Sequence, residues 1–117
     1  MWEIEVTDQF LEWYGTLEVE QRNAVEAAVN QLEAGGPALR RPFVGAIEGS
    51  RHANMKELRP LGGKLRVLFA FDPRRMAILF IGGDKTNRWR EWYEEMIPVA
   101  DSLYDEHLDT LKGEGLL

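Results

Sequence analysis

Two apolar stretches separated by a proline turn limit the fold of this chain more than any other feature. Residues 65–72 place Leu65, Val67, Phe69 and Phe71 on one face of an extended chain, and residues 76–82 are again mostly apolar. The link, Asp72-Pro73-Arg74-Arg75, has proline at the position that a type I turn favours. Residues 55–61 form a third stretch, joined through a Gly-Gly pair. We therefore predict an antiparallel meander of three strands.

The rest of the chain predicts helices around this meander. Residues 2–6 alternate like a half-buried strand, and Thr7 can cap a helix that carries apolar side chains to Leu17. A second helix runs from about Glu18 to a Gly-Gly-Pro stop, and residues 37–54 follow as a long ordered loop. A short helix capped by Asn87 and a last helix from Pro98 to Gly113 complete the order β-α-α-β-β-β-α-α. This predicts an α+β fold with its helices on one sheet face.

Size and composition exclude several classes of protein. The 117 residues suffice for one domain, residues 1–117, with a single core. Without cysteine there is no disulfide, thiolate nucleophile or sulfur zinc site, and two histidines cannot form a His-rich metal cluster. No apolar run approaches the ~20 residues of a membrane span, and no signal peptide is evident. We expect a cytoplasmic protein that needs neither metal nor cofactor.

Positive charge is concentrated in the middle of an acidic chain. Residues 40–90 carry twelve Lys/Arg against four Asp/Glu, a net charge of +8, whereas the whole chain has a net charge of −6. A phosphate backbone responds to charge within a Debye length of about 8 Å, so the local balance matters more than the total. The middle third can therefore bind RNA or DNA.

Strand alternation indicates which of these cations share a face. Arg66 lies opposite the large apolar residues of its strand, on the side that we expect to be uncovered, and Glu57 shares a face with Arg59, away from Lys56. Neighbouring cations lower the pKa of a lysine toward the range of a useful base, whereas arginine can clamp a phosphate attacked by a ribose 2′-hydroxyl. The catalytic candidates for such RNA chemistry are Lys56, Arg59, Arg66, Lys85 and Tyr93. The RNA-binding candidates are Arg51, His52, Lys64, Arg74, Arg75, Arg88 and Trp89.

Each signal also has a structural explanation. Arg59 can simply form a salt bridge with Glu57, and the helical spacing of Trp89, Trp92 and Tyr93 suits core residues as well as a base-stacking surface. We interpret His107, on an apolar helix stripe, as structural. Residues 82–85 lack the spacing of a Walker loop, which excludes nucleotide hydrolysis.

The same segments resemble a known family. Residues 49–59, residues 65–75, and Gly83-Asp84-Lys85 with Trp89 and Trp92-Tyr93 are similar to the phage-derived Gp49-like, HigB-type branch of the RelE/ParE toxin superfamily. The similarity covers about residues 1–111. It implies a small α+β toxin with a concave antiparallel sheet, acting as a ribosome-dependent mRNA endonuclease that a neighbouring helix-turn-helix antitoxin neutralises.

The resemblance also implies roles for single residues. Lys56 and Arg59 match the basic strand, Arg66 matches the arginine that contacts the scissile phosphate, Lys85 matches a basic position after the last central strand, and Tyr93 matches a C-terminal aromatic. The acidic ends depart from strongly basic relatives. Two alternatives stay open: a ParE-like, non-catalytic DNA gyrase inhibitor, and an inactive homologue that only binds partners.

Overall fold

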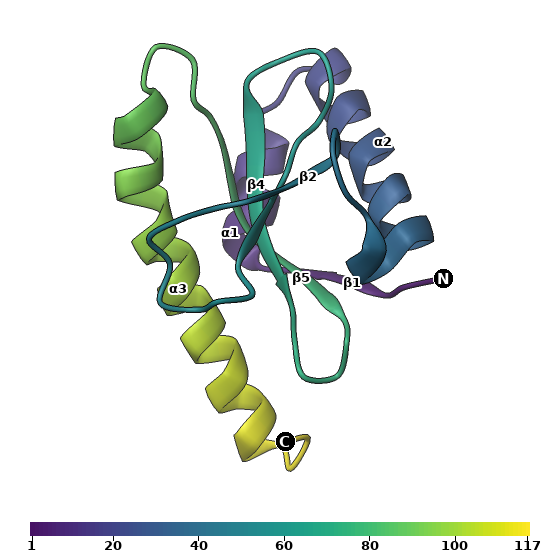
Figure 1. Ribbon diagram of the computed structural model, residues 1–117, viewed down its shortest axis with the longest axis vertical. Coiled ribbons are helices and arrows are strands. Elements are labelled where there is room, and N and C mark those ends of the chain that lie inside the picture. Colours follow the sequence, from purple (N-terminus) through teal and green to yellow (C-terminus); the bar gives the residue numbers. More distant parts are fainter.

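A five-stranded sheet lies between helices in the computed structural model, which describes residues 1–117 (Figure 1). The sheet has the order β1-β5-β4-β3-β2, in which β1 runs parallel to β5 and the other neighbours are antiparallel. The α+β class and the central meander are thus confirmed. The elements are β1 (Ile4–Val6), α1 (Asp8–Gly15), α2 (Val19–Gly35), the 3-10 turn η1 (Gly36–Ala38), β2 (Val44–Ala46), β3 (Lys56–Leu58), β4 (Leu65–Phe71), β5 (Ala77–Asp84) and α3 (Trp89–Gly113).

One face of the sheet packs against α1 and α2. Val67 and Phe69 of β4 meet Phe10 of α1 and Leu32 of α2 in a continuous core. Thr7 caps α1, accepting a hydrogen bond from the Phe10 amide at 3.0 Å, as its position before the helix predicts. This core fixes the sheet, and with it the direction of every side chain on the opposite face.

The opposite face is covered by α3, so the expectation of helices on one face only is wrong (Figure 1). Leu68 and Phe80 pack there against Trp92 and Ile97 of the helix. The residues of β4 that face α3 are small or apolar, like those that face α1 and α2, which is typical of a strand buried on both faces. Arg66 is the second residue of β4 and lies at the border of the area that α3 covers. Its side chain is 14% exposed.

A single helix replaces the two predicted at the C-terminus. Pro98 lies inside α3 and is itself exposed. A proline within a helix costs about 3 kcal/mol, because it cannot donate to the carbonyl four residues earlier. The apolar stripe continues on both sides of Pro98, from Trp92 to Leu111, and its burial against the sheet offsets that cost.

The segment predicted as an irregular loop contains the sheet's edge strand. β2 has three residues and pairs with β3, Gly45 lying opposite Glu57. Val44-Gly45-Ala46 lies in a stretch rich in Gly, Pro and Arg that shows no clean period, so the sequence pattern did not reveal this strand. After β2 the chain crosses to α3, where the Ser50 hydroxyl and the Arg51 amide both donate to the Asp101 carboxylate.

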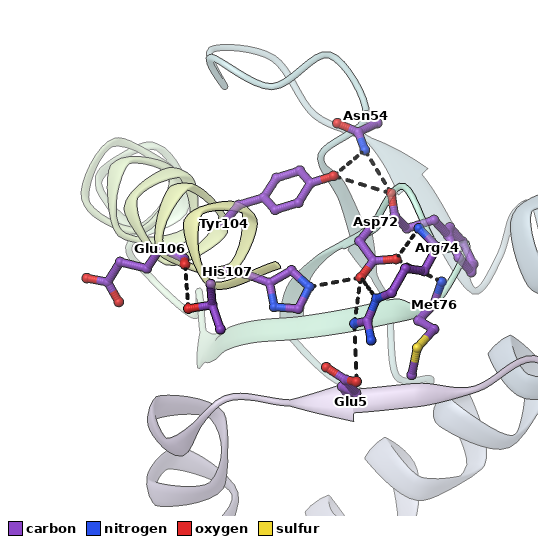
Figure 2. Close-up of polar contacts among 10 residues, drawn as sticks. Glu5, Asn54, Asp72, Arg74, Met76, Tyr104, Glu106 and His107 are labelled. Carbon is purple, nitrogen blue, oxygen red and sulfur yellow. Dashed lines mark hydrogen bonds and ion pairs between the residues drawn. The ribbon is translucent and has the colours of Figure 1, made fainter. Parts of the chain in front are cut away.

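A buried carboxylate ties three elements together at the far end of the sheet (Figure 2). Asp72, in the β4–β5 turn, accepts hydrogen bonds from Arg74 at 2.8 Å and contacts His107 of α3 at 2.9 Å. Arg74 also reaches Glu5 of β1 at 3.2 Å. Burial raises the pKa of Asp72, but the hydrogen bonds from His107, Arg74 and the Met76 amide outweigh it, and the net pKa is lowered. His107 is accordingly structural.

Candidate active site

A cleft of about 670 Å³ lies where the end of the sheet meets the first turns of α3. The segment after β2 forms one wall, β3 and β4 form the floor, and α3 forms the opposite wall. The lining side chains include four cations and three carboxylates. The full lining is Ala46, Ile47, Glu48, Gly49, Glu57, Arg59, Arg66, Lys85, Trp89, Arg90, Tyr93, Glu94, Ile97 and Pro98.

Strand register explains why the charged residues of the floor gather here. Glu57 on β3 pairs with Leu68, and Arg66 lies two residues before Leu68 on β4, so both point to the same face. Arg66 pairs in turn with Gly83 of β5, and Lys85 lies two residues beyond Gly83. The period of two therefore aligns one charged side chain from β3, one from β4 and one from the residue that follows β5.

Glu57 is the centre of this arrangement. Its side chain is only 3% exposed, and both carboxylate oxygens are engaged. The Tyr93 hydroxyl donates to Oε1 at 2.6 Å, and Arg59 donates to Oε2 through Nε at 2.9 Å, with its Nη2 at 2.7 Å. A carboxylate offers about four acceptor sites, so Glu57 keeps acceptor capacity beyond these donors.

The two guanidinium groups reach Glu57 in different ways. Gly45 has no side chain, and a Cβ there would overlap the Arg59 guanidinium, so this glycine makes room for the Arg59–Glu57 contact. Arg66 Nη1 donates to the Leu65 carbonyl at 2.7 Å, while its Nε lies 3.9 Å from Glu57 Oε1. That Nε is buried and has no hydrogen-bond partner. Arg66 thus retains an unused donor at the cleft.

Lys85 is a buried ammonium group held by an aromatic ring. The residue is 2% exposed, and its Nζ lies 2.9 Å from the Trp89 ring centroid and 5.9 Å from that of Tyr93. Burial, and then the positive charge of Arg66, lower the pKa of Lys85. A lysine with a lowered pKa transfers its proton more readily near neutral pH than a free lysine does.

Tyr93 completes the cleft from α3. Trp92, its neighbour, packs on Gly83, where any side chain would collide with the indole ring, and this contact brings the helix close to the sheet. Burial first, and then the hydrogen bond to Glu57, raise the pKa of Tyr93 to about 12. Its hydroxyl therefore remains protonated at neutral pH and acts as a hydrogen-bond donor.

The structure brings four of the five catalytic candidates together: Arg59, Arg66, Lys85 and Tyr93 all line the cleft. The fifth, Lys56, points to the other face of β3 and lines a separate, smaller cleft. The salt bridge between Arg59 and Glu57, offered as a structural explanation, does form.

Among the RNA-binding candidates, only Trp89 lines the large cleft, with 63% of the residue exposed. Arg75 lies over the Trp2 ring at 5.6 Å, and Lys64 is exposed near the end of β4. The other four are paired with acids: Arg51 and His52 with Asp105, Arg74 with Asp72, and Arg88 with Glu95.

The charged residues of this site that sequence reasoning left out include Glu57, Arg90 and Glu94. Glu57 was assigned only a salt-bridge role, although its alternation with Arg59 already placed it on the same face. Arg90 and Glu94, on the first turns of α3, could be found only once the helix was known to cover this face. No three His, Cys, Asp or Glu side chains lie close enough to bind a metal ion together, and no helix has the length and apolar character to cross a membrane.

The fold is similar to that of small bacterial and archaeal toxins of known structure. The isolated RelE toxin of Escherichia coli superposes with a TM-score of 0.58 over 72% of this chain and 84% of that one, at 8% identity. The RelE–RelB complex of Pyrococcus horikoshii gives a TM-score of 0.58 over 72% and 94%, at 16% identity. The protein therefore has the RelE fold, as expected.

Sequence similarity then identifies the branch. The family model "Phage derived protein Gp49-like" matches residues 12–105. Two Mycobacterium tuberculosis proteins described as candidate toxins are similar: HigB3 is 45% identical over 88% of this chain and 90% of its own length, and HigB2 is 48% identical over 82% of this chain. The chain spans about half the length of HigB2 (49%). It belongs to the Gp49-like family of HigB-type toxins, which confirms the resemblance.

Proposed function

We propose that this toxin inhibits translation by cutting mRNA on the ribosome without a metal ion. The supporting observation is the position of Glu57: a buried carboxylate, able to accept a proton, lies beside Arg59, Arg66 and Lys85 in one cleft. Cleavage of RNA at a 2′-hydroxyl needs a base, a clamp for the growing phosphate charge and an acid for the leaving oxygen. These residue types supply all three.

Glu57 acts as the general base in this proposal. It takes the proton of the ribose 2′-hydroxyl while that oxygen attacks the adjacent phosphorus. Tyr93 and Arg59 hold the carboxylate in place, through contacts of 2.6 and 2.7 Å. The raised pKa of Tyr93, about 12, keeps its proton in place and leaves the transfer to Glu57.

Arg66 and Lys85 act on the phosphate. The free Nε of Arg66 donates to a nonbridging oxygen, which gains negative charge as the new bond forms. The bond to the 5′-oxygen then breaks, and Lys85, whose lowered pKa favours proton release, protonates that oxygen. The products are a 2′,3′-cyclic phosphate and a free 5′-hydroxyl end. Lys56 takes no part in these steps.

The proposed partners follow from the family and the fold. The archaeal RelE neighbour was solved in complex with RelB, and we propose that a helix-turn-helix antitoxin neutralises this toxin in the same cell. A ribosomal target places the proposed activity in the cytoplasm.

Expression of the toxin with transcript mapping tests the activity. We expect growth arrest and new 5′-hydroxyl ends in translated mRNA, and loss of both in Arg66→Ala, with the circular dichroism spectrum unchanged. Arg22→Ala, which removes a cation outside the cleft on α2, is the matched control and should remain toxic. Intact transcripts together with a DNA damage response would instead identify a gyrase inhibitor, and absence of toxicity would identify an inactive homologue.

A further inference from the structure

A second cleft of about 470 Å³ lies beside the edge strand β2. Its lining contains three cations, from the segment before β2 and from the first residue of β3. No carboxylate is among the residues that line it: Leu39, Arg40, Arg41, Val44, Gly45, Ala46 and Lys56.

The charge of this second cleft is not neutralised within the chain. Arg40, Arg41 and Lys56 form no salt bridge, and Arg40 and Arg41 are exposed. In the large cleft, by contrast, Glu48, Glu57 and Glu94 stand among the cations. The second cleft therefore carries positive charge that attracts anions, although the whole protein has a net charge of −6.

The lining selects a kind of anion. Two guanidinium forks and one ammonium group match the oxygens of successive phosphates. The apolar part consists of Leu39, Val44 and Ala46, without an aromatic ring on which a base could stack. The chemistry suits a sugar–phosphate backbone, whose bases point away from the protein.

Position connects this cleft with the proposed active site. Ala46 lines both clefts, so a single extended polymer can pass from one cleft to the other around the end of β2. Lys56 and Glu57 are adjacent on β3 and point to opposite faces, which places one in each cleft. A strand held by its reacting phosphate in the large cleft thus has a path into the second.

We propose that Arg40, Arg41 and Lys56 form a subsite for the phosphate backbone of the same RNA strand that enters the large cleft. The identity of the strand rests on the proposed function, whereas the binding itself does not require cleavage. Continuity with the large cleft favours RNA over an acidic segment of a partner protein. The subsite contributes affinity that is independent of base sequence.

Equilibrium binding of the purified toxin to a fluorescent single-stranded RNA, followed by anisotropy over a range of salt concentrations, tests this subsite. Because each phosphate contact on a single strand contributes about 0.7 to the slope of log K against log salt, Arg40→Gln/Arg41→Gln should reduce the slope by about 1.4. Adding Lys56→Gln should reduce it further. The control Arg22→Gln/Lys112→Gln removes the same charge at a distance and should change the slope by less than half as much.

Other outcomes separate this subsite from competing explanations. An unchanged slope in the cleft variant, or an equal loss in the control, overturns the subsite. Competition by inorganic phosphate as strong as that by RNA would reveal a free-anion site and overturns it too. Loss of antitoxin binding with intact RNA binding assigns the cleft to the protein partner. Normal RNA binding by a wild-type toxin that cuts no transcript refutes the nuclease proposal but leaves the subsite standing.

Discussion

Replacing Glu57 with glutamine tests the proposed base while preserving its shape. The Tyr93 hydroxyl can still donate to the amide oxygen, but Arg59 loses the carboxylate that it contacts at 2.7 and 2.9 Å. Hydrogen bonds to charged groups contribute about 1.5–3 kcal/mol, and the Arg59 side chain is 28% exposed, so water recovers part of that loss. We expect Glu57→Gln to be about 2 kcal/mol less stable than the wild type, which lowers Tm by about 8 °C.

The effect on cleavage should be much larger than this loss of stability explains. Removing a general base typically costs about 10² to 10⁴ in rate, and an assay run well below Tm keeps the variant folded. Cleavage of a reporter mRNA in a reconstituted translation system, with 5′ ends mapped over time, measures the rate. Asp72→Asn is the matched control, because it removes another buried, ion-paired carboxylate far from the cleft. We expect Asp72→Asn to lose similar stability and to keep its cleavage rate.

The result that contradicts the role of Glu57 is therefore specific. If folded Glu57→Gln cuts within about threefold of the wild-type rate, the carboxylate only positions Arg59 and another group removes the proton. If Asp72→Asn loses as much activity as Glu57→Gln, the loss reflects stability rather than chemistry.

Three further changes test other parts of the structure. Trp89→Leu removes the ring beneath the Lys85 ammonium, and it should slow cleavage about tenfold and shift the basic limb of the pH profile. Trp89→Phe keeps an aromatic ring and should retain most activity. Equal cleavage rates in the Leu and Phe variants would contradict a role for the ring. Gly45→Ala should displace Arg59 from the cleft and lower RNA affinity without loss of helicity by circular dichroism, and unchanged affinity would contradict this. The pKa of Asp72 in the folded state is lowered from 3.8, so the Asp72 carboxylate stabilises the fold above that pH and this stabilisation is lost on acidification. Urea titrations should therefore show Asp72→Asn less stable than the wild type at pH 7. The difference should shrink below about pH 3.8.

Alternation along the strands predicted the floor of the cleft because side-chain direction is a local property. The period of two put Arg59 on the same face as Glu57 and put Arg66 opposite the large apolar residues of its own strand, and β3 and β4 pair in the register that brings these side chains together. The same rule placed Lys56 on the other face. Lys56 was nevertheless named a catalytic candidate, from the concentration of charge on these strands and from the resemblance of the basic strand, neither of which takes account of the direction in which a side chain points.

The walls of the cleft depend on contacts that no local pattern contains. Tyr93 lies over Glu57 because α3 covers the second face of the sheet, and this position depends on Trp92 packing against Gly83. A helical stripe predicts that a helix is buried on one side, but not on which sheet face it lies. The proposed role of Glu57 depends on the same packing, because the Tyr93 hydroxyl that donates to its carboxylate comes from α3.

The proposed function requires an acidic protein to bind RNA, and the way the fold separates paired from unpaired cations supports that proposal. Where the basic segment meets the acidic termini, ion pairs neutralise it: Arg51 with Asp105, Arg88 with Glu95, and Arg74 with Glu5. The cations that form no salt bridge include those that line the small cleft and also Lys85 of the large cleft, whose ammonium group lies over the Trp89 ring. Because ion pairs cancel the field of the paired cations within a few ångströms, an approaching phosphate backbone is drawn to the two clefts around β2. In the proposed function, the acidic helices would restrict where RNA binds and would not prevent its binding.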